Sequence, residues 1–165
     1  MHEACEKNQL SCVRALLDHG TDENVENAGQ ETPLMIAVQH GHYNMAKLLL
    51  DRGGANANKG DDWNNTPLHV AARQNHVDIV KLLLLTTTST SDYDNLPATI
   101  FVDAKNNYHE TPLHQACWLG REKSSRLLLE HGANAQAKNK DQQTPIDYAR
   151  VRGHTELLTI LPKYV

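Results

Sequence analysis

The sequence predicts an all-α solenoid, in which helix–turn–helix units with short β-hairpin loops stack into a single domain over residues 1–165. Two features of the chain support this prediction. Thr-Pro-Leu, with one Thr-Pro-Ile variant, recurs at spacings of 34, 45 and 33 residues. The four copies begin at Thr32, Thr66, Thr111 and Thr144. Leucine runs follow the first three copies in phase, at residues 48–50, 82–84 and 127–129, and a repeat of this period indicates stacked supersecondary units.

Each Thr-Pro pair predicts the start of the first helix of a unit. The threonine hydroxyl accepts a hydrogen bond from a backbone N–H of the first turn, and proline suits the first helical position. At about 100° per residue, Leu68, Ala71 and Ala72 lie close together on one face of this helix. Small alanines on that face allow neighbouring helices to approach closely.

The leucine runs predict the second helix of each unit, and a glycine is expected to end it. Gly20, Gly54 and Gly132 follow three of these helices, as in a C-terminal glycine cap. A hairpin then precedes the next Thr-Pro pair, with Asn or Asp five residues before the threonine, and these residue types favour turns. The four residues at this position are Asn27, Asp61, Asn106 and Asn139.

The repeated motif resembles that of ankyrin repeats. Residues 66–71 and 111–116 match Thr-Pro-Leu-His-x-Ala in full. The resemblance covers nearly the whole chain and implies about five repeats. We expect them at about residues 1–24, 25–58, 59–98, 99–136 and 137–165. The first lacks Thr-Pro, as in an N-terminal cap or a cut through a longer array, and Pro162 interrupts the last, as in a C-terminal cap.

The third unit contains an insertion of about 12 residues, which we place at residues 86–98. Residues 86–91 consist only of Thr and Ser. One interpretation is a surface loop that the array tolerates. The other is a loop that contacts a partner or is phosphorylated, because hydroxyl clusters are sites for such modification.

The composition argues against several classes of protein. A formal net charge of −4 disfavours binding to nucleic acid, which needs a basic surface. Cys5, Cys12 and Cys117 are too few for a disulfide framework and suit a reducing compartment. The sequence contains no signal peptide and no apolar run long enough to cross a bilayer. We therefore expect a cytoplasmic or nuclear monomer without a membrane partner.

The sequence predicts no catalytic residue, no cofactor and no metal site, and hence no enzyme. Eight of the ten histidines recur at fixed positions of the repeat, which favours structural hydrogen bonds. His2, Cys5 and Cys12 lack a fourth ligand at a spacing that zinc sites use. Neither a glycine-rich phosphate motif nor a nucleophile elbow is present in the sequence.

The family resemblance implies a recognition surface made of the hairpin tips and of the outward face of the first helices. Helical geometry independently places the positions four, seven and eight residues after each threonine away from the core. The side chains at or beside these positions are Ile36, Gln39, His40, Val70, Arg73, Gln74, Gln115, Trp118, Leu119, Tyr148, Arg150 and Val151.

Both tryptophans fall at positions that the scaffold does not need. Trp63 and Tyr108 occupy equivalent tips of neighbouring repeats, and Trp118 lies at an outward helix position. Trp, Tyr and Arg are favoured at interface hot spots. We therefore predict a partner-binding patch; its residues are Trp63, Arg73, Tyr108, Trp118, Leu119, Gln39, His40, Gln74, Asp62 and Glu110. The alternative is that each ring only packs against an adjacent tip or helix.

Acidic side chains at the tips suggest a polar rim around the aromatic residues. They are Glu31, Asp61, Asp62, Glu110 and Asp141. Such a rim favours a partner with basic groups.

The resemblance implies a protein–protein interaction module, an adaptor or scaffold, that binds a protein partner through its concave face and hairpin tips. Two alternatives stay open. One is a substrate-recognition or autoinhibitory segment of a larger enzyme, which the truncated first unit suggests. The other is binding of a nucleic acid or a small ligand, which the acidic balance disfavours.

Overall fold

The computed structural model describes residues 1–52, 54–86 and 100–164. Within these ranges the chain forms α-helices, a terminal 3₁₀ helix and turns, and no strand is assigned. The helices are α1 (His2–Glu6), α2 (Leu10–Asp18), α3 (Pro33–Gln39), α4 (Tyr43–Asp51), α5 (Pro67–Gln74), α6 (Val77–Leu85), α7 (Pro112–Trp118), α8 (Glu122–Glu130), α9 (Pro145–Val151), α10 (Thr155–Ile160) and η1 (Leu161–Tyr164). The prediction of an all-α solenoid is confirmed.

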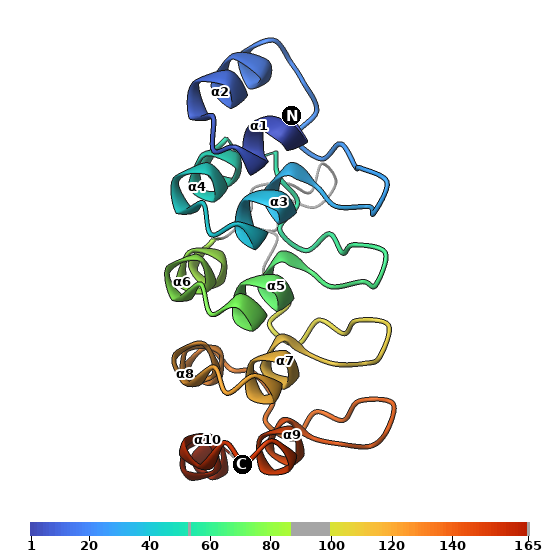
Figure 1. Ribbon diagram of the computed structural model, residues 1–165, viewed down its shortest axis with the longest axis vertical. Helices are drawn as coiled ribbons and strands as arrows, with labels where there is room; N and C mark the ends of the chain where they lie inside the picture. Colours follow the sequence, from blue (N-terminus) through green and yellow to red (C-terminus); the bar gives the residue numbers. More distant parts are fainter. Residues whose placement is uncertain (53, 87–99, 165) are drawn as a thin grey trace.

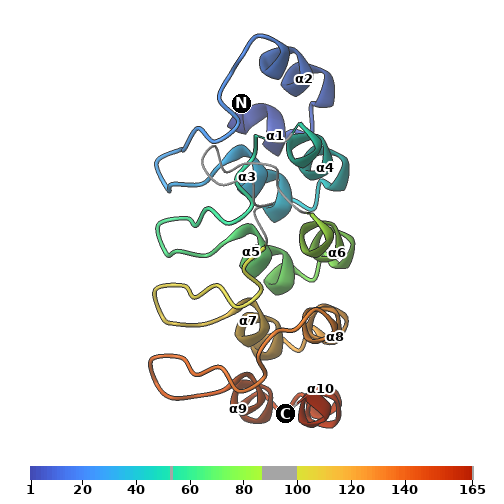
Figure 2. The same ribbon diagram turned by 180° about the vertical axis from the view of Figure 1, so that it is seen from behind.

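The helices form two rows that run the length of the molecule. The odd-numbered helices α1 to α9 stack in one row and the even-numbered helices α2 to α10 in the other (Figure 1). Hairpin-shaped loops project from the odd-numbered row, away from the even-numbered one, and the view from behind shows the same arrangement (Figure 2). The surface formed by the odd-numbered helices and the loops is therefore continuous from repeat to repeat.

The first helices begin where the Thr-Pro pairs predict. Thr32, Thr66, Thr111 and Thr144 are the N-cap residues of α3, α5, α7 and α9, and each has an extended backbone. The proline that follows each threonine is the first helical residue. The backbone nitrogen at that position donates no hydrogen bond within the helix, so the missing N–H of proline is tolerated.

Histidines link each first helix to the following repeat. In α5 the backbone N–H of Thr66 donates to His69 Nδ1 at 3.1 Å, and His69 Nε2 donates to the carbonyl oxygen of Glu110 at 3.0 Å. His114 makes the equivalent pair of bonds with Thr111 and with the carbonyl oxygen of Gln143. The structural interpretation of these imidazoles therefore holds for both full copies of the motif.

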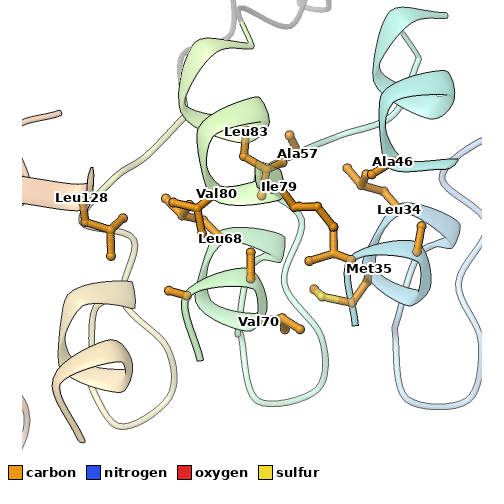
Figure 3. Close-up of a cluster of buried hydrophobic side chains, with 14 of the residues drawn as sticks. Leu34, Met35, Ala46, Ala57, Leu68, Val70, Ile79, Val80, Leu83 and Leu128 are labelled. Carbon is orange, nitrogen blue, oxygen red and sulfur yellow. The ribbon is translucent and has the colours of Figure 1, made fainter. Parts of the chain in front are cut away.

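One continuous apolar core fills the space between the two rows. The motif leucines Leu34 and Leu113 are fully buried, and Leu68 is only 1% exposed. Figure 3 shows part of this core, in which side chains of α3, α5 and α6 lie close together. Cys5 and Cys117 are also buried, and burial raises the pKa of the Cys117 thiol to about 12, so this sulfur behaves as a small apolar group.

The loop tips are rigid turns built on the Asn or Asp that precedes each threonine by five residues. Asn106 Oδ1 accepts hydrogen bonds from the backbone N–H groups of Tyr108 and Glu110, at 2.9 and 3.0 Å. Asn27, Asp61 and Asn139 accept the same two bonds in their own loops. Backbone bonds also join neighbouring tips, as from Asn107 N–H to the carbonyl oxygen of Trp63 at 2.9 Å. The tips are thus held at fixed positions relative to one another.

The predicted ends of the second helices agree with the structure at two of three glycines. Gly20 and Gly132 follow α2 and α8 with positive φ, as a glycine cap requires. The prediction for Gly54 is wrong, because α4 already ends at Asp51 and Gly54 does not have a positive φ. Pro162 does interrupt the last helix, which continues only as the 3₁₀ helix η1.

The insertion begins where α6 ends, at Leu85. Thr86 Oγ1 donates to the carbonyl oxygen of Leu82 at 2.6 Å. Residues 87–99, which contain the rest of the Thr/Ser cluster, lie outside the described residues.

Candidate functional site

A hollow of about 240 Å³ opens on the surface of the odd-numbered helix row. Its walls come from α5, from the loop tip before α7, from α7 and from α9. The lining residues are Arg73, Glu110, Gln115, Trp118, Leu119 and Tyr148. Four of these belong to the predicted patch, while Gln115 and Tyr148 were identified only as outward helix positions.

Tyr148 forms the inner wall of the hollow. Its ring centroid lies 5.1 Å from that of Trp118 and 5.5 Å from that of His114, which it meets edge to face. The phenol donates a hydrogen bond to Glu110 Oε1 and accepts one from Asn139 Nδ2 at 2.9 Å. Partial burial and the adjacent Glu110 raise the pKa of Tyr148 to about 12, so the hydroxyl remains a donor at any physiological pH. Ring and hydroxyl therefore have fixed orientations.

Trp118 is held from two sides but still faces solvent. The guanidinium carbon of Arg152 lies 4.5 Å from the centre of its ring, which is a cation–π contact. His154 Nε2 donates to the Trp118 carbonyl oxygen at 3.2 Å. Trp118 nevertheless remains 39% exposed. A large ring that is fixed in position and exposed is suited to contact a partner.

Trp63 and Tyr108 form a stacked pair at neighbouring loop tips. Their ring centroids lie 6.1 Å apart with an interplanar angle of 12°. Each ring packs against the other, as the structural alternative expects, yet Trp63 is 57% exposed and Tyr108 is 54% exposed. Stacking therefore orients the two rings without removing them from the surface.

Gln115 carries an acceptor without a donor. Asn65 Nδ2 donates to the Asp61 carboxylate, so Asn65 Oδ1 faces the other way and accepts from Asn106 Nδ2 and Gln115 Nε2, both at 3.0 Å. This chain of bonds fixes which end of the Gln115 amide is the oxygen. Gln115 Oε1 is buried and has no hydrogen-bond partner within residues 1–52, 54–86 and 100–164.

Arg73 lies at the end of α5, half-buried against the hollow. Its carbonyl oxygen accepts a hydrogen bond from Arg121 Nε at 3.0 Å, which ties α5 to the loop before α8. The Arg73 guanidinium forms no ion pair with a carboxylate in the part of the chain that the structure describes.

The other predicted patch residues lie outside the hollow. Gln39 and His40 are exposed at the end of α3, where His40 stacks on His42 with centroids 5.7 Å apart. Gln74 and Asp62 are exposed, at the end of α5 and at the tip beside Trp63. The structure thus divides the predicted patch into a hollow, a pair of aromatic tips and scattered polar positions.

One prediction about this surface is wrong, at two residues. Ile36 and Val70, expected to face outward, are only 9% and 3% exposed. A helical wheel treats one helix alone, whereas successive first helices pack directly on one another and cover these positions. Three of the predicted rim carboxylates, those of Asp61, Glu110 and Glu31, accept hydrogen bonds within the protein.

Metal sites and membrane spans are two other kinds of feature that a chain of this kind can carry. Within the described ranges, no group of three or more His, Cys, Asp or Glu side chains is arranged to hold a metal ion. None of the helices described in this structure is long and apolar enough to cross a membrane.

Comparisons with known proteins agree with the repeat pattern along the chain. The family model for ankyrin repeats (3 copies) matches residues 1–95, 55–139 and 92–164. Ankyrin repeat and SOCS box protein 16 of Homo sapiens is 32% identical over 174 residues, covering 99% of this chain and 35% of that protein. E3 ubiquitin-protein ligase XB3 of Oryza sativa subsp. japonica is 36% identical over 138 residues, which is 83% of this chain and 30% of the ligase.

A third relative is the transient receptor potential cation channel subfamily A member 1 of Homo sapiens. It is 26% identical over 171 residues, covering 96% of this chain and 14% of the channel. The chain therefore spans between 14% and 35% of the length of these three relatives. Because the matches to the family model extend from residue 1 to residue 164, the chain belongs to the ankyrin-repeat family.

Proposed function

We propose that this chain recognises a protein partner through the hollow at Trp118 and the aromatic tips at Trp63 and Tyr108. Ankyrin repeats are protein-interaction modules, and ankyrin-repeat domains are generally non-catalytic. The observation that carries the proposal is the set of three large aromatic rings that are held in place yet 39–57% exposed. Fixed rings lose little conformational entropy when a partner covers them.

The chain acts as an adaptor or as the recognition segment of a larger protein, and not as an enzyme itself. Two relatives support this proposal: one is named an E3 ubiquitin-protein ligase and the other an ankyrin repeat and SOCS box protein. In both, the matched region is about a third of the protein, so other parts of those chains are available for other activities. A reducing compartment such as the cytoplasm or nucleus fits the free thiols, including the exposed one of Cys12.

Capture of partners from a lysate of the source cells tests the proposal. Wild-type protein is compared with the double variant Trp63→Ala/Trp118→Ala and with Tyr43→Ala. Tyr43 is 40% exposed, almost the same as Trp118, but it belongs to α4 in the other helix row. Circular dichroism establishes that all three proteins have the same helix content.

A protein that wild type and Tyr43→Ala retain, and that the double variant loses, supports the proposal. A protein retained equally by all three places the interface elsewhere and overturns the assignment to this surface. The expected loss is large, because truncation of a hot-spot tryptophan costs about 2 kcal/mol or more in binding free energy.

A further inference from the structure

Two arginines at or beside the hollow form no ion pair with a carboxylate among the residues that the structure describes. Arg73 lines it, and Arg152 lies over the Trp118 ring. Six ion pairs form within the described ranges, and all of them use other basic residues. The whole chain has 20 acidic and 16 basic residues, so two arginines without carboxylates at one hollow depart from the general charge of the protein.

The one carboxylate in the lining is already engaged. Glu110 Oε1 accepts from the Tyr148 hydroxyl, and Glu110 Oε2 accepts from Asn106 Nδ2 at 3.2 Å. Its backbone carbonyl accepts from His69. Glu110 therefore belongs to the scaffold and forms no ion pair with Arg73, and no other described carboxylate pairs with the Arg73 guanidinium.

The contact between Arg152 and Trp118 also leaves donors available. A guanidinium that lies over an aromatic ring uses its flat face for that contact. Its N–H groups lie in the guanidinium plane and point outward from the edge, where a carboxylate binds them in pairs. The Arg152 guanidinium therefore lies beside Trp118, which itself lines the hollow.

We infer that the hollow binds an acidic segment of a protein partner, with an Asp or Glu carboxylate at Arg73, an apolar side chain on Trp118 and Leu119, and further acidic side chains toward Arg152 beside Trp118. This inference rests on the proposed function and adds the chemistry of the partner. It differs from the basic partner that the acidic tips suggest, because Arg73 lines the hollow and Arg152 lies over the Trp118 ring.

The side-chain oxygen of Gln115 favours a partner that also carries hydrogen-bond donors. Its Oε1 lacks a partner in the described structure, and a buried acceptor without a donor is energetically unfavourable. Gln115 lines the hollow, so a peptide segment bound there brings backbone N–H donors to this amide. A segment that carries both carboxylate acceptors and backbone donors therefore matches the lining better than a purely anionic molecule.

A displayed library of random linear peptides tests the inference. Wild type, Arg73→Glu, Trp118→Ala and Arg126→Glu each select peptides under the same conditions. Arg126→Glu is the control for net charge, because it changes the charge by the same amount, while Arg126 is exposed on α8 in the other helix row. Arg73→Gln, which removes the charge without reversing it, covers the case in which Arg73→Glu does not fold.

We expect wild type and Arg126→Glu to enrich peptides with Asp or Glu beside an apolar residue. Arg73→Glu is expected to lose that preference and to favour Lys or Arg at the same position. A synthetic copy of the best peptide, with its acid changed to the matching amide, is expected to bind wild type about tenfold or more weakly. The difference should shrink as NaCl rises, because salt screens the charge pair.

Three results would overturn the inference. The first is enrichment of basic or purely apolar peptides by wild type and not by Trp118→Ala, which leaves the proposed function standing. The second is Arg73-dependent binding of a mixed-sequence single-stranded oligonucleotide that is tighter than binding of the acidic peptide. The third is a library from which no Trp118-dependent peptide emerges, and the lysate capture then still decides the proposed function.

Discussion

His69 binds the carbonyl oxygen of Glu110, a residue 41 positions further along the chain, while its other ring nitrogen accepts from Thr66. This arrangement allows only one protonation state. Nδ1 must be an acceptor because the backbone N–H of Thr66 can only donate, and Nε2 must carry the proton because a carbonyl oxygen can only accept. A second proton on the ring would place two donors face to face. The geometry therefore requires a neutral imidazole.

We predict that mild acid weakens the fold through His69. Burial lowers the pKa of His69 from its ordinary 6.5 to about 4, and burial lowers the pKa of His114 as well. Between pH 6.5 and about pH 4, His69 binds a proton in the unfolded chain but not in the folded chain. The stability that neutral His69 contributes is therefore complete above pH 6.5 and is lost as the pH falls toward 4. Each pKa unit is worth about 1.4 kcal/mol, so His69 alone accounts for up to about 3 kcal/mol. Urea unfolding at several pH values between 4 and about 7.5 measures this dependence.

The matched variants are His69→Gln and His19→Gln. The first removes the buried imidazole and is expected to lower stability at neutral pH but to flatten the pH dependence. His19 is exposed beyond α2, so its replacement should change neither quantity. An unchanged pH dependence in His69→Gln would show that other groups cause the acid sensitivity.

Local chemistry made the first helices and the tips predictable from the sequence. Thr66 and Pro67 act within one helical turn, and Asn106 binds N–H groups two and four residues away, so no distant residue is needed to place them. The motif Leu and Ala positions are buried for the same reason, since they follow from a single helix. The exposure of Trp63 and Trp118 also follows from their positions in the repeat.

The features that the sequence did not predict depend on contacts between repeats. Val70 is buried because the neighbouring first helices cover it, which a single helix does not reveal. Tyr148 reaches Glu110 across 38 residues, and Gln115 reaches Asn65 across 50, so neither could be assigned to the hollow by the repeat pattern alone. Their outward helix positions were the only signal in the sequence.

We predict that Gly120→Ala is more destabilising than Gly153→Ala. Both glycines have positive φ, 66° and 71°, so alanine at either position adds about 1–2 kcal/mol of backbone strain. At Gly153 the added Cβ meets no atom within 4 Å, whereas at Gly120 it lies 2.7 Å from the His154 ring. That ring donates to the Trp118 carbonyl oxygen, so displacing it also loses a hydrogen bond.

Thermal unfolding of the two glycine variants compares their stabilities directly. Gly120→Ala is expected to have the lower Tm and also to bind partner more weakly, because Trp118 is a wall of the hollow. Equal Tm values would mean that His154 moves aside without loss, and that its hydrogen bond contributes nothing to the position of Trp118.

We predict that Gln115→Met separates stability from binding. Methionine has a similar length and removes an acceptor that has no donor in the described structure, at the cost of one hydrogen bond to Asn65. These two effects oppose each other at about 1 kcal/mol each, so stability should change little. Binding of the acidic peptide should fall, because the amide is lost from the hollow. A large drop in Tm with unchanged peptide affinity would assign Gln115 to the scaffold.

Tyr148→Phe tests whether the hydroxyl bridge of the last repeat fixes the hollow. The variant keeps the ring contacts with Trp118 and His114 but leaves Glu110 Oε1 and Asn139 Nδ2 without the hydroxyl. We expect a loss of about 1–3 kcal/mol in the free energy of unfolding, because a partly buried carboxylate loses a donor. Tyr164→Phe, at an exposed tyrosine of η1, is the control and should be neutral.

Tyr148→Phe is also expected to weaken binding of the acidic peptide through a change in the charges at the hollow. Once the Tyr148 hydroxyl is absent, Glu110 is free to turn toward Arg73, which lines the same hollow. An ion pair between them would occupy the donors that we assign to the partner, so affinity for the acidic peptide should fall more than affinity for its amide copy. Fluorescence anisotropy with the two peptides measures this difference at low and high salt. Equal losses for both peptides would show that Glu110 stays in place and that Tyr148 acts only through the shape of the hollow.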